Sequence, residues 1–305
     1  MEDGAKLDRI LAIGRFARGT ATHAYQRHDL DVTAKRSTRR VAVHCFTPHE
    51  APNAMPLVLL PGGAFSGASA YFDLGPRLLA LMPHRTMVFV DTPGSGASDR
   101  RVAWLSHRTI AALIAHAVTA VLGPIRLVLG GHSQGGAFAQ IIARRLLLDA
   151  AALVLIDPQP AVGAGVWRTF RKIAPIARDP ARVAREFLYS PVADEGTIAL
   201  VRSVSANAAV PARALLATLS GRDCPAPAHP YRRPTLIVGA EASQAIDQND
   251  LRAMSISGAF PSARYVPIRH MADRPAGHCD ILERAETAAV IHGFLTRLDQ
   301  TKEGP

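Results

Sequence analysis

Residues 125–142 have the sequence Ile-Arg-Leu-Val-Leu-Gly-Gly-His-Ser-Gln-Gly-Gly-Ala-Phe-Ala-Gln-Ile-Ile. A short apolar run comes first, a glycine-rich turn follows, and a segment that suits a helix completes the stretch. A run that is apolar on both faces and ends at glycine is typical of a strand buried in a parallel sheet. The stretch therefore predicts a strand, a sharp turn and a helix in direct succession, with Ser133 in the turn.

Other apolar runs along the chain have the same form, and each ends at a turn with glycine or proline: 56–60, 86–90, 152–156 and 235–238. Segments of helical length alternate with the runs: 71–81, 109–121 and 134–148. A further run at 41–46 alternates apolar and polar residues, as a half-exposed strand does. The alternation predicts an α/β fold with a mostly parallel sheet, in which ligands bind beyond the carboxyl ends of the strands.

Residues 161–230 interrupt this alternation. They contain segments of helical pattern but no clear strand, and prolines stand near both ends. We interpret this region as a helical lid over the carboxyl edge of the sheet. The expected organisation is an N-terminal extension at 1–40, with an early helix near 7–18, and a core at 41–160 and 231–305, into which the lid is inserted.

The composition is that of a globular protein, with 48% hydrophobic and 20% charged residues among 305. Cys45, Cys224 and Cys279 are odd in number and widely spaced, which argues against a disulfide framework and against a zinc site. The N-terminal residues lack the apolar core of a signal peptide, and no run is long enough to cross a bilayer. We therefore expect a cytoplasmic protein with no membrane partner.

The net charge of +10 is spread over scattered arginines, with only short clusters at 35–36 and 39–40. No nucleic-acid-binding motif accompanies them, so we expect a solvated basic surface and no nucleic-acid partner. The positive field would favour an anionic substrate, free or attached to an acidic carrier protein.

The pattern Gly131-x-Ser133-x-Gly135 between a strand and a helix is typical of a nucleophile elbow. The sharp turn places the serine hydroxyl at a helix N-terminus, where backbone amides favour a developing negative charge. The backbone N–H of Gln134, directly after the serine, is then an expected oxyanion-hole donor.

Two more motifs occur in a recognisable order: Leu-Pro-Gly-Gly at 60–63 and Asp-Thr-Pro-Gly-Ser-Gly-Ala-Ser-Asp at 91–99. With the Gly-His-Ser-Gln-Gly elbow, they make residues 41–298 resemble the α/β-hydrolase fold superfamily. The resemblance implies an α/β-hydrolase fold, with a mostly parallel central sheet, helices on both faces and a helical lid. It also implies that Gly63 supplies the second oxyanion-hole donor, although Pro61 stands where the family usually has histidine.

A serine needs a base to take its proton. The resemblance assigns that role to His278, which follows Gly277 in a loop before a final helix at 287–295. His270 lies in the same loop and His132 adjoins the serine, and we expect both to have packing or surface roles.

The acid of the expected triad departs from the family pattern. Relatives commonly carry an aspartate three or four residues past the glycine that ends the penultimate strand, but after Gly239 those positions hold Ala242 and Ser243. The leading alternatives are Asp157, which ends the strand after the elbow helix, and Glu241, which is early in the usual loop. Other groups such as Asp247 and Asp250, or no acid at all, stay open.

These residues predict a serine hydrolase that acts on an ester, thioester or lactone of a small-molecule acyl substrate and needs no metal or organic cofactor. An alternative keeps the fold but runs a lyase, cyclisation or acyl-transfer step in a biosynthetic pathway. A third hypothesis is a non-catalytic binding protein. The sequence does not identify the substrate. It also leaves the oligomeric state open, and a homo-oligomer is one of the alternatives.

Overall fold

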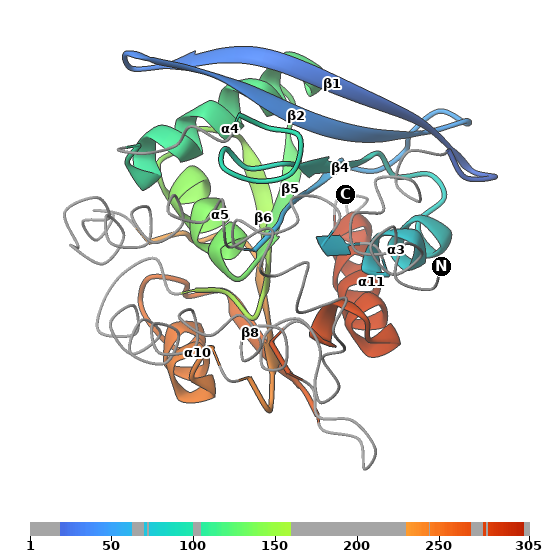
Figure 1. The fold of residues 1–305 in the computed structure, drawn as a ribbon. Coiled ribbons are helices and arrows are strands. Elements are labelled where there is room, and N and C mark those ends of the chain that lie inside the picture. The colour runs from blue at the N-terminus through green and yellow to red at the C-terminus, as the bar shows by residue number, and fades with distance from the viewer. Residues whose placement is uncertain are drawn as a thin grey trace, which may run out of the picture.

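The computed structural model describes residues 19–62, 70–71, 73–99, 105–159, 230–243, 245–269, 277–278 and 280–301 (Figure 1). The early helix expected near 7–18 lies outside these ranges, as does the lid expected at 161–230 apart from its last residue. Among the described residues, every helix is too short or too polar to cross a membrane.

The described strands form one eight-stranded sheet in the order β1-β2-β4-β3-β5-β6-β7-β8. Their bounds are β1 His23–Ala34, β2 Ser37–Pro48, β3 Leu57–Leu60, β4 Met87–Val90, β5 Leu127–His132, β6 Ala150–Ile156, β7 Thr235–Ala240 and β8 Ala263–Ile268. The β1–β2 and β2–β4 pairs are antiparallel, and all the other pairs are parallel. The prediction of an α/β fold with a mostly parallel sheet is confirmed.

Helices cover both faces of this sheet, as Figure 1 shows. They are α3 Leu74–Leu81, α4 His107–Leu122, α5 Gln134–Arg144, α10 Gln248–Ser255 and α11 Ala285–Gln300, with a short 3-10 helix η3 at Asp280–Leu282. Side chains of α4, α5 and α10 belong to one apolar cluster, and those of α3 and α11 belong to the other. The sheet is therefore the middle of three layers.

Strand β3 shows why the apolar runs are continuous. Leu57 and Leu59 pack on the α3 and α11 side, whereas Val58 and Leu60 pack on the α4 and α5 side. Successive side chains of a strand point to opposite faces, so a strand between two helical layers must be apolar at every position.

The ends of α4 follow from local chemistry. The side chain of Ser106 accepts a hydrogen bond from the backbone N–H of Thr109, which satisfies one of the free donors of the first turn. At the other end, Gly123 has φ +75°, a conformation that favours glycine, and its N–H donates to the carbonyl of Thr119.

Strand β1 corrects the expected N-terminal extension at 1–40. It pairs with β2 along its whole length, from His23 opposite Pro48 to Ala34 opposite Ser37. Helix α4 packs on both strands of this hairpin. The segment assigned to an extension thus contains an edge strand of the core sheet.

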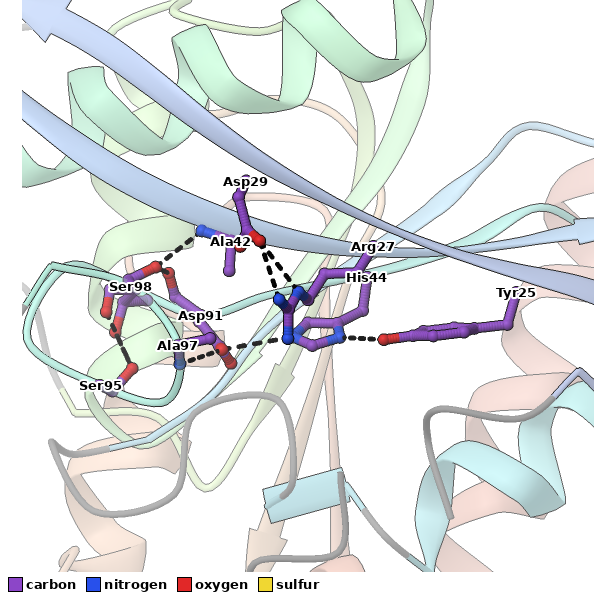
Figure 2. A network of polar contacts seen from close by, with 10 residues as sticks. Tyr25, Arg27, Asp29, Ala42, His44, Asp91, Ser95, Ala97 and Ser98 are labelled. Carbon is purple, nitrogen blue, oxygen red and sulfur yellow. Dashed lines mark hydrogen bonds and ion pairs between the residues drawn. The ribbon is translucent and has the colours of Figure 1, made fainter. Parts of the chain in front are cut away.

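A polar network fastens the β1–β2 hairpin to the loop after β4 (Figure 2). His44 lies on β2 with its Nε2 3.2 Å from Oδ2 of Asp91 and its Nδ1 2.9 Å from the hydroxyl of Tyr25. Both His44 and Asp91 are only 2% exposed. The backbone N–H of Ala97 donates to the same Asp91 oxygen over 2.7 Å.

Two residues of the same loop show why its motif has these residue types. A Cβ at Gly96, where φ is +52°, would lie 2.2 Å from a carboxyl oxygen of Asp91. The hydroxyl of Ser98 donates to the carbonyl of Asp91 over 2.6 Å and accepts from the N–H of Ala42 over 2.8 Å. The Gly-x-Gly-x-Ser pattern therefore serves a tight loop that closes on its own aspartate.

Candidate active site

Ser133 lies in the turn between β5 and α5, as the sequence predicts. Its backbone angles are φ 51° and ψ −120°, a strained conformation for a residue other than glycine. The flanking glycines have no room for a side chain: a Cβ at Gly135 would lie 2.1 Å from the carbonyl oxygen of Leu60, and one at Gly131 would lie 2.4 Å from the carbonyl carbon of Gly135. The turn therefore needs glycine on both sides of the serine.

His278 and Asp157 complete a hydrogen-bonded chain with Ser133. The Nε2 atom of His278 lies 2.8 Å from Oγ of Ser133, and its Nδ1 lies 2.6 Å from Oδ2 of Asp157. A carboxylate can only accept, so Nδ1 is the donor and Nε2 is left to accept from the serine hydroxyl. His278 is 4% exposed and Asp157 is fully buried, so bulk water does not compete for either contact.

Asp157 is surrounded by donors at the end of β6. Its Oδ2 accepts from His278 and from the hydroxyl of Ser243 at 2.6 Å, and its Oδ1 accepts from the N–H of Ala240 and from Nε2 of Gln248, each at 3.1 Å. Burial alone would raise the pKa of Asp157, but these hydrogen bonds and the nearby imidazole outweigh burial, and the pKa lies below its ordinary value. The carboxyl group is held ionised and ready to orient the imidazole.

The other carboxylates considered from the sequence lie elsewhere. The side chain of Glu241 is exposed, and its backbone N–H extends the β7–β8 pairing to the carbonyl of Ile268. Asp247 caps α10 by accepting from the N–H of Asn249, and Asp250 stands in the first turn of that helix. Of the carboxylates weighed for the acid, Asp157 is the one that the structure brings into contact with His278.

Of the two expected oxyanion-hole donors, Gln134 and Gly63, the structure describes only Gln134. Gln134 is the first residue of α5, so its backbone N–H belongs to the first turn, where donors lack a partner within the helix. Gly63 lies outside the described residues. Its neighbour Gly62 lies against the elbow, since a Cβ there would be 2.7 Å from Cβ of Ser133. The loop that leads to Gly63 thus runs beside the serine.

His132 adjoins the serine and contacts the base. Its ring centroid lies 4.6 Å from that of His278, and burial, aided by the nearby His278, lowers the pKa of His132 to about 3. The neutral ring donates from Nε2 to the backbone carbonyl of His278 over 2.8 Å. This side chain therefore supports the loop of His278. His270, for which the sequence predicts a packing or surface role, lies outside the described residues.

Three residues around the site were missed by sequence reasoning. Tyr71 donates to the carbonyl of Leu60 over 2.6 Å and accepts from the N–H of His132 over 3.1 Å, which ties β3 to the elbow. Ser243 and Gln248 hold Asp157. The sequence offered a clue for Ser243, because it stands where relatives keep the acid. For Tyr71 and Gln248 no sequence pattern indicated a role at the site.

Solved structures similar to this chain have low sequence identity to it. A thermophilic esterase from Thermogutta terrifontis, solved with malate bound, is 21% identical with a TM-score of 0.64, and the match covers 90% of this chain and 99% of that chain. A membrane phospholipase A, described as a novel bacterial virulence factor, is 21% identical with a TM-score of 0.72, over 99% of this chain and 93% of that chain. A proline iminopeptidase from Mycobacterium smegmatis is 17% identical with a TM-score of 0.60, over 92% of this chain and 100% of that chain.

At these identities the likeness concerns the fold alone. No curated protein matches the chain. Residues 57–290, however, match the model of the alpha/beta hydrolase family. The expected α/β-hydrolase fold is thereby confirmed, and because the matched region spans most of the sequence, the chain belongs to the alpha/beta hydrolase family.

Proposed function

We propose that this protein is a serine hydrolase that cleaves a carboxylic ester, thioester or lactone through an acyl-enzyme on Ser133. The observation that carries the proposal is the continuous chain from Ser133 Oγ to His278 Nε2 at 2.8 Å and from His278 Nδ1 to Asp157 Oδ2 at 2.6 Å. These contacts fall within the range that proton transfer requires.

The geometry supports a two-step reaction. Ser133 attacks the substrate carbonyl while His278 takes its proton, and a bond forms between Oγ and the acyl carbon. The backbone N–H groups of Gln134 and Gly63 stabilise the oxyanion. His278 then gives the proton to the leaving alcohol or thiol. Water, deprotonated by the same imidazole, attacks the acyl-enzyme and frees the acid and the serine, and none of these steps needs a metal or an organic cofactor.

The acid influences which chemistry the site favours. The usual loop lacks the aspartate, and a site with a weakened or absent acid would suit a lyase, a cyclisation or an acyl transfer. The contact of Asp157 with His278 supplies an acid from another strand, so the altered loop no longer speaks for a non-hydrolytic reaction. The serine and histidine in hydrogen-bond reach also weigh against a non-catalytic binding protein.

Two observations bear on the acyl substrate, and a third bears on the compartment. Two of the similar structures are named as an esterase and a phospholipase, enzymes of ester bonds. The net charge of +10 favours an anionic acyl compound, either free or bound to a carrier. Cys45 is a free, buried thiol, which fits the reducing conditions of the cytoplasm.

The test is labelling by a fluorophosphonate probe with peptide mapping, together with hydrolysis of a short-chain nitrophenyl ester. We expect the wild type to be labelled at Ser133 and to turn over the ester. Ser133→Ala should abolish labelling, and Ser133→Ala or His278→Ala should lower kcat by about a millionfold, as loss of a triad member does elsewhere.

A matched control is Ser255→Ala on α10, where the hydroxyl donates to a carbonyl of its own helix. This variant should be labelled and turn over as the wild type does. Folded wild type that takes up no probe would refute the activated serine, and labelling without ester turnover would favour the non-hydrolytic alternatives.

A further inference from the structure

We infer that Gln248 is a positioning residue of this site: its amide, oriented by Tyr265, holds the Asp157 carboxylate in the orientation that His278 needs. Neither Gln248 on α10 nor Tyr265 on β8 belongs to the triad. The inference rests on the proposed serine-hydrolase function, since it assigns the group that supports the acid of that reaction.

The amide of Gln248 bridges two partners with opposite requirements. Its Nε2 donates to Oδ1 of Asp157 over 3.1 Å, while its Oε1 accepts from the hydroxyl of Tyr265 over 2.7 Å. A flipped amide would turn its oxygen toward the carboxylate, and two acceptors would then face each other. The tyrosine hydroxyl thus keeps the donor end of Gln248 on Asp157.

The donors divide evenly between the two carboxylate oxygens. Oδ2 of Asp157 receives His278 and Ser243, and Oδ1 receives Gln248 and the N–H of Ala240. Without the Gln248 amide, Oδ1 would keep a single donor, and the carboxyl group could rotate about its last bond. Because the His278 contact is made by the other oxygen of the same planar group, such a rotation would move the acceptor away from Nδ1.

The backbone makes room for this arrangement at one position. A Cβ at Gly239, near the end of β7, would lie 2.3 Å from Oε1 of Gln248 and 2.8 Å from the hydroxyl of Tyr265. A side chain there would therefore displace the carbonyl end of the amide and the tyrosine that orients it. The absence of a side chain at Gly239 allows α10 and β8 to deliver their groups to Asp157.

The test compares Gln248→Leu, Tyr265→Phe and the double variant in hydrolysis of a nitrophenyl ester. Gln248→Leu removes the donor at similar volume and should lower kcat about tenfold to a hundredfold, with KM changed less than about twofold, because the loss affects the transition state. Tyr265→Phe should lower kcat by a smaller factor. In the double variant, Tyr265→Phe should lower kcat almost no further than Gln248→Leu alone does, because the tyrosine hydroxyl acts through the amide.

The matched control is Asn249→Leu, which makes the same change from amide to leucine at the next, exposed position of α10. It should leave kcat and KM as in the wild type. The thermal midpoint of each variant shows whether the compared proteins are folded. If Gln248→Leu does not fold, a lower kcat at unchanged KM in Tyr265→Phe would support the inference, and wild-type kcat in that variant would overturn it.

Either of two results with folded Gln248→Leu would overturn the inference alone: wild-type kcat, or an effect confined to KM. An equal loss from Tyr265→Phe in both backgrounds would also overturn it, since the tyrosine would then act independently of the amide. Wild type that neither binds the fluorophosphonate probe nor hydrolyses the ester would overturn both this inference and the proposed function.

Discussion

Ser133 and Asp157 both adopt backbone conformations that side chains other than glycine rarely take, with φ of 51° and 38°. They directly follow neighbouring strands of the sheet, β5 and β6, so the strain is concentrated where the chain leaves these strands and presents its groups to His278. Such a conformation costs about 1–3 kcal/mol per residue and persists only where the surroundings impose it. Here the close backbone contacts at the elbow and the four donors on Asp157 impose it.

The location of the acid gives a prediction at this scale. Asp157→Asn should lower kcat by about ten-thousandfold, as the loss of the oriented imidazole does in other triads. When Ser243→Asp is added to Asp157→Asn, kcat should rise at least about tenfold above that of Asp157→Asn alone, because a carboxylate can supply the lost contact from position 243. The Ser243 hydroxyl lies 2.6 Å from the Asp157 oxygen that contacts His278, so a carboxylate there is within reach of Nδ1.

Hydrolysis of a nitrophenyl ester by the single and double variants measures this rescue. Glu241→Gln serves as the control and should retain wild-type kcat, since that side chain is exposed. Loss of activity in Glu241→Gln together with full activity in Asp157→Asn would assign the acid to Glu241 instead.

Among the elements, the β1–β2 hairpin depends on polar contacts on one face. Its α4 side is apolar, with Val32 and Ala34 in the core, but on the other face His44 connects Tyr25 of β1 to Asp91 of the loop after β4 (Figure 2). In addition to the β2–β4 pairing, the hairpin is therefore joined to this loop by the buried imidazole of His44 and by the hydrogen bond from Ala42 to Ser98.

His44→Phe should lower the free energy of unfolding by about 2–3 kcal/mol, because Asp91 would lose a donor while remaining buried. Urea denaturation followed by circular dichroism measures the change. The control is His49→Phe at an exposed position just beyond β2, which should change the free energy by less than about 0.5 kcal/mol. Equal stability of the wild type and His44→Phe would show that the network contributes nothing to the fold.

On the scale of the whole molecule, the three layers bury histidines whose pKa in the folded state is well below the ordinary value. Burial lowers the pKa of His132 to about 3 and that of His107, which stacks on Phe138, to about 4, from an ordinary value of 6.5. An unfolded chain protonates both residues as the pH falls below 6.5, whereas the folded chain protonates them only as the pH approaches these lower pKa values.

The free energy of unfolding should therefore fall as the pH decreases from 6.5 towards 4, by up to about 1.4 kcal/mol per pH unit for each histidine. Asp157 acts in the same direction at lower pH: its folded pKa is depressed, so its contribution is present above the ordinary value of 3.8 and is lost below it. Urea denaturation at a series of pH values between 7 and 5 tests the slope. His107→Phe should flatten the slope by the share of one histidine, and a stability that does not depend on pH would contradict the argument.

Much of this architecture follows from local sequence. The strands β3 to β7 were predicted because a strand buried between two layers is apolar at every position, and the elbow because a strand, Gly-x-Ser-x-Gly and a helix follow each other directly. Strand β1 escaped prediction because residues 23–29 are mostly polar and lack the regular alternation of a half-exposed strand, so the 1–40 segment resembled an extension. Strand β8 was not predicted, because it forms no continuous apolar run and all of its residues except Ile268 are partly buried or exposed.

At the site, the sequence by itself determined Ser133 and, through resemblance, His278 as candidates, because each stands in a short motif whose geometry is local. Only the tertiary structure places Asp157 against His278 and leaves the side chain of Glu241 exposed. Asp157 and Glu241 follow adjacent strands, and the direction of each side chain depends on the turn that follows its strand. Residue 157 turns inward to the imidazole and residue 241 faces solvent. The donors Ser243 and Gln248 likewise reach Asp157 only when β6, β7 and α10 are packed together, a relation between distant segments that no local pattern encodes.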